Sequence, residues 1–250
     1  MSGDDKLIIA RTEDLFSLCE RRGVAVFSGF LDGAEQALIQ DELVFPYAYN
    51  VKIYGGFDDA EKKIIGVFPE WEEPDISAFP IRCIKIEGGF SRKLTHRDYL
   101  GTIMSLGIVP SRLGDIVVGE GCAYVFVHED VYEFVKDNIT KIGREGVKVT
   151  DITNHDDITI ERKYKTIGTV CASDRIDAVT AAAANISRAQ SSALISDGLV
   201  KLNHRVITKT AEKVKEGDLL SIRGSGRFLV HSFDGETRKN RMHVTLKQYI

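Results

Sequence analysis

Residues 81–150 carry an order of strand and helix signals that strongly restricts the fold of this part of the chain. Extended runs occur at 81–86, 116–118, 123–127 and 147–150. One helical pattern separates the first two runs and a second helical pattern separates the last two. The resulting order, β-α-β-β-α-β, belongs to the ferredoxin-like fold, in which two helices cover one face of a sheet. We therefore predict an α+β protein with a ferredoxin-like domain at its centre.

The two helices of this segment have local signals of their own. Thr95 and Asp98 have the spacing of a capping box, which predicts a helix start, and Gly107 is a natural stop. The buried stripe of this helix is predicted at Tyr99, Ile103 and Leu106. For the second helix, apolar residues recur at helical spacing at Val131, Phe134, Val135, Ile139 and Ile142.

The third predicted strand partly follows the sheet-face motif of RNA-binding modules. Tyr124 and Phe126 point the same way by two-residue alternation, so bases could stack on them. The motif's leading cation and its last aromatic are missing, because Glu120 and Val127 stand there. Packing of the two rings against a neighbouring domain is the favoured interpretation, and RNA stacking is the alternative.

The preceding residues predict a small domain of helices plus a hairpin. Helical patterns cover 6–22 and 35–43, and extended runs follow at 49–54 and 63–68. Three prolines in an acidic stretch, Pro69, Pro74 and Pro80, mark a boundary near residue 75. We therefore expect domains at 1–75, 76–152 and 174–250, with 153–173 as a linker or a strand.

Residues 174–250 begin with signals for two short helices on a small sheet. Ser173 or Asp174 can cap the first helix, and Ser187 and Gln190 have capping-box spacing for the second. The apolar stripe of the second helix is predicted at Ile186, Ala189, Ala193 and Leu194. A different face would then carry one cation and two hydroxyls, from Arg188, Ser191 and Ser192.

Charge divides unevenly along the chain. Residues 174–250 hold 13 Lys+Arg against 8 Asp+Glu, whereas the first 173 residues hold 20 against 29. A basic module joined to an acidic body indicates a phosphate-rich partner, because each Lys or Arg near a phosphate releases counterions. The alternative is a solvated charged surface.

Other classes of protein find little support in the sequence. No apolar run reaches the length of a membrane helix, and the start lacks the regions of a signal peptide, so a cytoplasmic protein is expected. The four cysteines are far apart, which predicts reduced thiols and no metal site. The His96-Arg97-Asp98 triplet lacks the other signatures of a kinase, and no Walker loop, dinucleotide fingerprint or nucleophile elbow occurs. We expect no cofactor and no catalytic residues.

Residues 174–230 hold glycines, cations and polar residues in a specific order and spacing. The positions are Arg175, Asp177, Ser187, Arg188, Ser191, Gly198, Val200, Asn203, Gly217, Asp218, Gly224, Gly226, Arg227 and Phe228. This pattern closely resembles the RNA-binding domain named after ribosomal small-subunit protein S-four. The resemblance implies contacts to structured RNA from Arg175, Arg188, Ser191, Lys201, Asn203 and Arg227. The alternatives are a surface salt bridge for each arginine, with Asp177 or Asp174 as the partner of Arg175, and a purely local backbone role for Asn203.

A second set of motifs spans most of the chain. Its members are the run 93–101 and the triplets Phe79-Pro80-Ile81, Ser105-Leu106-Gly107, Gly114-Asp115-Ile116 and Ile142-Gly143-Arg144. With these motifs nearly the whole chain resembles the YlmH family of bacterial proteins, and the run 93–101 is the most specific of them. The resemblance implies a non-enzymatic RNA-binding factor, associated with ribosomes and stalled-translation quality control and linked genetically to cell division in Gram-positive bacteria. It also implies a second RNA-binding surface in the middle domain, which we place at Lys93, His96 and Arg97.

The leading hypothesis is a binder of structured RNA, either rRNA or tRNA on the large ribosomal subunit. One alternative is an RNA-modifying enzyme, such as a pseudouridine-synthase relative, whose catalytic site escapes motif analysis. The other is a scaffold that contacts division proteins through its acidic N-terminal part, with RNA binding incidental.

Overall fold

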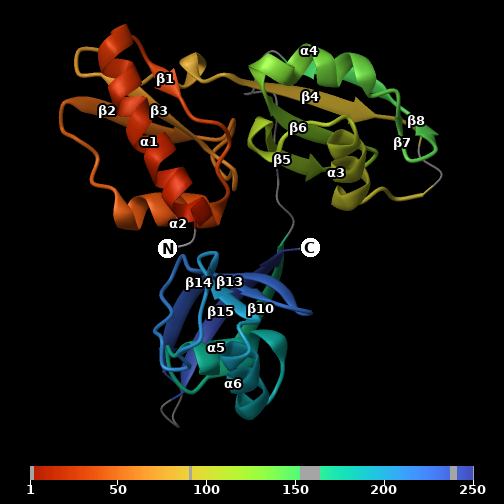
Figure 1. Ribbon diagram of the computed structural model, residues 1–250. Helices are drawn as coiled ribbons and strands as arrows, with labels where there is room; N and C mark the ends of the chain where they lie inside the picture. Colours follow the sequence, from red (N-terminus) through yellow and green to blue (C-terminus); the bar gives the residue numbers. More distant parts are fainter. Residues whose placement is uncertain (1–2, 90–91, 153–163, 237–240, 250) are drawn as a thin grey trace. The chain divides into compact units, whose positions relative to one another are not determined.

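The structure is a computed structural model that describes residues 3–89, 92–152, 164–236 and 241–249 (Figure 1). The chain divides into two compact units, Met1–Ile160 and Glu161–Ile250. The first unit contains the predicted N-terminal helices with their hairpin and the ferredoxin-like segment. The second contains the helix pair and its sheet.

The first unit begins with two helices packed on a three-stranded antiparallel sheet of order β1-β3-β2. The elements are α1 (Gly3–Arg22), β1 (Val26–Phe27), α2 (Gly33–Glu42), β2 (Tyr49–Tyr54) and β3 (Ile64–Pro69). The predicted helices and hairpin are confirmed. Strand β1 escaped the sequence analysis because its two residues are too few to show a period, and only pairing with β3 makes them a strand.

The middle of the chain forms the predicted ferredoxin-like fold. Its sheet has the order β5-β6-β4-β9, and each neighbouring pair is antiparallel. The elements are η1 (Ile76–Ala78), β4 (Ile81–Glu87), α3 (His96–Ser105), η2 (Pro110–Arg112), β5 (Leu113–Val118), β6 (Cys122–His128), α4 (Glu129–Asn138), β7 (Lys141–Ile142), β8 (Glu145–Gly146) and β9 (Lys148–Ile152).

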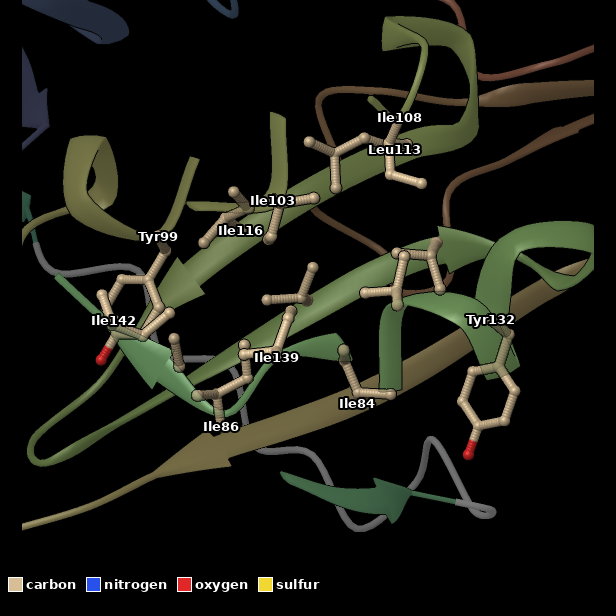
Figure 2. Close-up of a cluster of buried hydrophobic side chains, with 14 of the residues drawn as sticks. Ile84, Ile86, Tyr99, Ile103, Ile108, Leu113, Ile116, Tyr132, Ile139 and Ile142 are labelled. Carbon is tan, nitrogen blue, oxygen red and sulfur yellow. The ribbon is translucent and has the colours of Figure 1, made fainter. Parts of the chain in front are cut away.

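Helices α3 and α4 cover one face of this sheet. Figure 2 shows Ile84 and Ile86 of the sheet in one cluster with Tyr99 and Ile103 of α3 and with Tyr132 of α4. The predicted stripe of α3 is confirmed at Tyr99 and Ile103, which are buried.

The prediction for α4 was wrong in part, because Phe134 is 49% exposed whereas Tyr132 is 2% exposed. The helix ends at Asn138, so Ile139 and Ile142 are buried beyond it rather than on its stripe. The helical period was extended past Asn138 to Ile142, and this placed the predicted buried face on the wrong side of α4.

The other sheet face packs against the N-terminal part of the same unit. Phe126 is 0% exposed, and its ring centroid lies 4.9 Å from that of Phe57. Phe30 and Phe68 belong to the same buried cluster, and Tyr124 lies partly buried at its border. The packing interpretation is therefore confirmed for Phe126, whose ring is closed to any base.

The second unit is one six-stranded sheet of order β10-β15-β14-β13-β11-β12 with two helices on one face. The elements are β10 (Tyr164–Cys171), α5 (Ile176–Ala184), α6 (Arg188–Ser196), β11 (Val200–Leu202), β12 (Arg205–Val206), β13 (Leu219–Ile222), β14 (Gly226–Glu236) and β15 (Met242–Tyr249). The sheet is larger than predicted, because β10, β14 and β15 extend it. Of the predicted linker or strand, residues 164–171 are a strand of this sheet, and 153–163 lie outside the described residues.

The helix pair begins as predicted in α6 but not in α5. Ser187 N donates to Gln190 Oε1 at 2.9 Å, and Gln190 N donates to Ser187 Oγ at 3.2 Å, which completes the capping box. The N-cap of α5 is Arg175 rather than Ser173 or Asp174.

The prediction for the buried face of α6 was also wrong in part, because Leu194 packs against the core as expected but the two alanines do not. Ser191 and Ile195 are its buried residues, whereas Ala189 and Ala193 are exposed. The error arises because burying an alanine methyl contributes little, so alanines fix a helix face weakly.

Candidate RNA-binding surfaces

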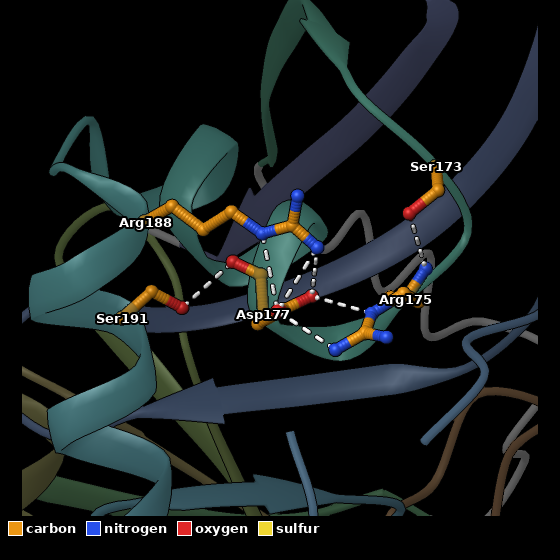
Figure 3. A network of polar contacts seen from close by, with 5 residues as sticks. All are labelled: Ser173, Arg175, Asp177, Arg188 and Ser191. Atoms are coloured by element: carbon orange, nitrogen blue, oxygen red, sulfur yellow. Dashed lines mark hydrogen bonds and ion pairs between the residues drawn. The ribbon is translucent and has the colours of Figure 1, made fainter. Parts of the chain in front are cut away.

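A buried carboxylate holds two arginines at the start of the helix pair. Asp177, in the first turn of α5, is 4% exposed. Arg175 donates to it through Nε at 3.2 Å and Nη2 at 3.1 Å, and Arg188 donates through Nε at 3.1 Å and Nη2 at 3.0 and 3.1 Å. The arginine side chains are 39% and 51% exposed, so one buried anion orients two surface cations (Figure 3).

The contacts of this cluster favour the charged forms of Asp177 and Arg175. Burial raises the pKa of the Asp177 carboxyl, but the hydrogen bonds from Arg175 and Arg188 outweigh it and hold that pKa below its ordinary value. The same contact raises the pKa of Arg175. Two cations against one anion leave the cluster with a net positive charge. Figure 3 shows a terminal nitrogen of Arg188 turned away from Asp177.

Both arginines also stand at helix N-termini. Arg175 is the N-cap of α5 and Arg188 is the first residue of α6. The backbone N–H groups and the positive end of the helix dipole favour anions at such positions. A phosphate placed there would meet the guanidinium N–H groups that are not bound to Asp177, together with the helix ends.

Ser191 is placed differently from the other predicted contacts. Its side chain is 0% exposed, and its hydroxyl donates to the backbone carbonyl of Asp177 at 2.8 Å. This bond ties α6 to the first turn of α5 and so fixes the distance between Arg188 and its carboxylate. Ser191 therefore supports the arginine cluster from inside the domain, where its hydroxyl has no exposed surface to offer RNA.

Lys201 and Arg227 lie on the sheet, on the face opposite the helices. Strand register aligns Lys201 with Ser221 and Ser221 with Arg227, while their neighbours Leu202, Leu220 and Phe228 face the helices. Lys201 is exposed, and the Arg227 guanidinium lies 4.6 Å from the ring centroid of Tyr249. The predicted cations therefore form two sets, one at the helix N-termini and one on the sheet.

Asn203 has a structural task in the turn after β11. Its φ of 48° is left-handed, a conformation that asparagine tolerates better than most residues. Its Nδ2 donates to Asp218 Oδ1, and its Oδ1 accepts from Leu219 N, both at 2.8 Å. The side chain thus fastens this turn to the start of β13, beyond its own backbone, and remains exposed.

Lys93, His96 and Arg97 are exposed around the N-terminus of α3. Asp98 closes that end, accepting from Thr95 N at 2.7 Å and from Arg92 Nη2 at 2.6 Å. The hydrogen bond from Arg92 is the largest cause of the lowered pKa of the Asp98 carboxyl. Arg92 was missed by the sequence analysis, since a neighbour outside the helix carries no periodic signal.

Two specific kinds of site are absent among the residues that the structure describes. There, no group of three His, Cys, Asp or Glu side chains is arranged to hold a metal ion. Nor is any described helix long and apolar enough to cross a membrane. All four cysteines are free thiols; Cys19, Cys83 and Cys171 are buried and Cys122 is half-buried.

Two families match this chain. Residues 74–156 match the family described as "Putative RNA-binding domain in YlmH". Residues 174–220 match the S4 domain, within the S-four-type region of the sequence analysis.

Similar proteins span most of the chain. The "Ribosome-associated protein quality control protein P2" of Bacillus subtilis is 31% identical over 226 residues, which cover 88% of this chain and 85% of that protein. The solved structure of "Cell division protein ylmH from Streptococcus pneumoniae" has a TM-score of 0.51 and 22% identity, covering 63% of this chain and 96% of its own. The second likeness concerns the fold alone.

Proposed function

Because this chain belongs to the YlmH family, we propose that it is a non-enzymatic protein that binds structured RNA on the ribosome. The RNA is rRNA of the large ribosomal subunit or tRNA bound to that subunit, and the cellular setting is quality control of stalled translation in the cytoplasm. The name of the B. subtilis relative supports the ribosomal setting. Contacts with division proteins are a further part of this proposal, motivated by the family resemblance.

The observation that carries the proposal is the arginine pair held by Asp177. Free arginine side chains lose rotamer entropy when they bind, and a guanidinium already fixed by a buried carboxylate loses less. The pair stands at two helix N-termini, where a phosphate is favoured by both charge and hydrogen-bond donors. Such a surface suits the backbone of a folded RNA without requiring a particular base.

A second surface is proposed at Lys93, His96 and Arg97. These residues are exposed at one end of α3, and the capping network around Asp98 fixes the start of that helix. They lie within the residues that match the first of the two families. Two surfaces in separate units would let one protein contact two RNA segments, with a gain in affinity set by effective concentration.

Sedimentation with purified ribosomal subunits at low and moderate salt tests the proposal. We expect salt-sensitive co-sedimentation with the large subunit. Arg188→Ala should weaken it and should reduce the slope of log affinity against log salt concentration by about one charge. Lys209→Ala is the matched control, since it removes an exposed cation of the same unit that is not among the proposed RNA contacts. Co-sedimentation that is absent in every subunit state, or equally affected by both variants, would overturn the proposal.

A further inference from the structure

The C-terminal sheet presents a row of cations and aromatic rings on the face opposite its helices. Strand pairing aligns Arg227 with Tyr249 through the neighbouring pair Phe228 and Gln248, and it pairs Tyr249 directly with Tyr164. Lys247 stands two residues before Tyr249 on β15, so it shares the same face. Four strands therefore bring side chains of two chemical kinds together: β11 and β14 supply Lys201 and Arg227, and β15 and β10 supply Tyr249, Lys247 and Tyr164.

The contacts within this row are close. The rings of Tyr164 and Tyr249 meet edge to face, with centroids 5.0 Å apart. The Arg227 guanidinium lies 4.6 Å from the centroid of Tyr249, and Lys247 Nζ lies 6.0 Å from that of Tyr164. All four side chains are half-buried, so packing restricts them while part of each remains in contact with solvent. We call these four residues the tyrosine platform.

We propose that the tyrosine platform binds unpaired RNA nucleotides, with bases stacking on the rings or on the Arg227 guanidinium and with Lys247 and Arg227 beside the phosphates. This inference rests on the proposed function, since it names the part of the RNA that this face takes. It adds a site to the arginine pair: Tyr164, Tyr249, Arg227 and Lys247 all lie outside the residues 174–220 that match the S4 domain.

The chemistry of the platform favours unpaired bases over a duplex or an acidic protein. Bases inside a duplex offer no free faces to a ring, whereas unpaired bases stack on aromatic side chains and guanidinium planes. Such stacking tolerates every base, so the platform should show little sequence preference. The Asp234 carboxylate accepts from Thr245 Oγ1 at 2.6 Å, and Asp234 lies on β14, seven residues after Arg227, toward the other end of the strand from the platform.

Fluorescence anisotropy with two labelled RNAs tests the inference on the full-length protein. One RNA is a hairpin, and the other is the same hairpin with an unpaired flank of about six nucleotides, within the usual range for such sites. We expect the wild type to prefer the flanked hairpin by about tenfold, the effect of roughly one stacked base. The variant Tyr164→Leu/Tyr249→Leu should lose this preference and keep its affinity for the plain hairpin.

Three controls separate the possible failures. Tyr164→Phe/Tyr249→Phe keeps the rings and should keep the preference. Arg188→Ala should weaken the binding of both RNAs equally, because it removes one member of the arginine pair and leaves the platform unchanged. Cross-linking of wild-type protein to a thiouridine in the flank should label the peptides that contain Tyr164 or Tyr249, even if the leucine variant is unstable.

The inference fails if the wild type shows no preference for the flank, if the leucine variant retains it, or if cross-links map elsewhere. Each result would leave this face to another partner, such as a protein, while hairpin binding through Arg188 would still stand. If the wild type bound neither RNA, that result would instead reject the proposed function, and this inference with it.

Discussion

Arg188 and Asp177 join α6 to α5 by two parallel hydrogen bonds, Nε to Oδ2 and Nη2 to Oδ1, each 3.1 Å long. One partner is nearly inaccessible, with 6% of its side chain exposed, whereas the other is 51% exposed. The pair therefore connects the packing of the helices to the charge of the surface. A change in the buried partner should be felt in both stability and RNA binding.

Asp177→Asn should destabilise the C-terminal unit and weaken RNA binding together. The amide would leave two guanidiniums without their carboxylate, which should lower the free energy of unfolding by about 1–3 kcal/mol. This is less than for a fully buried pair, because the arginines can turn to water. Hydrogen exchange of the α5 and α6 amides measures the loss within this unit. Asp174→Asn, which breaks the exposed pair with Lys213, is the control and should cost much less. Equal effects of the two changes would contradict the anchoring role of Asp177.

The contribution of Asp177 should depend on pH in a defined direction. Its pKa is lower in the folded state than its ordinary value, so its stabilising effect is present above the unfolded pKa of about 3.9. That effect is lost as pH falls through the folded pKa and the carboxyl binds a proton. The stability difference between wild type and Asp177→Asn should thus be full at neutral pH and should shrink below about pH 4. A stability difference that grows on acidification would contradict the lowered pKa of Asp177 in the folded state.

The residues of the arginine cluster could be predicted from the sequence, but their arrangement could not. Arg175 and Arg188 stood out by motif, and a pairing of Arg175 with Asp177 was among the alternatives. The sharing of one carboxylate by both arginines depends on how α6 packs on α5. The inward position of Ser191 depends on the same packing, because a nine-residue helix rich in alanine and serine fits more than one buried face. Hydrophobic periodicity alone does not choose between them.

The cysteines should differ sharply in reactivity in the native protein. Burial raises the pKa of the Cys83 thiol to about 12, so almost none of it is thiolate near neutral pH. Cys19 and Cys171 are also buried, and burial raises the pKa of each thiol. Cys122 is half-buried and should be the first to react. Timed alkylation followed by peptide mapping checks this order, with denatured protein as the control in which all four react. Early labelling of Cys83 would mean that the sheet opens readily where β4 pairs with β6, because Cys83 lies opposite Phe126 there.

The two sheets show the same limit of sequence reasoning on a larger scale. The ferredoxin-like order could be predicted because caps, glycines and alternation mark each element locally. The pairing of β10 with β15 joins residues about 80 positions apart, such as Tyr164 and Tyr249, and no local signal announces it. The tyrosine platform was invisible for that reason. It exists only where non-local register places two tyrosines and an arginine in one row.

Gly56→Ala and Gly101→Ala should change stability in opposite directions. Gly56 has φ +100°, and an added Cβ would lie 2.5 Å from Cδ1 of Phe126, in the core shared by the N-terminal part and the ferredoxin-like sheet. Backbone strain and overpacking together should cost about 2–4 kcal/mol. Gly101 is exposed within α3 with nothing within 4 Å of an added Cβ, so alanine there should stabilise the helix by about 0.5–1 kcal/mol. Hydrogen exchange of the β6 and α3 amides measures both changes in one unit. A Gly56→Ala protein as stable as the wild type would mean that Phe126 moves aside easily and that the shared core is loosely packed.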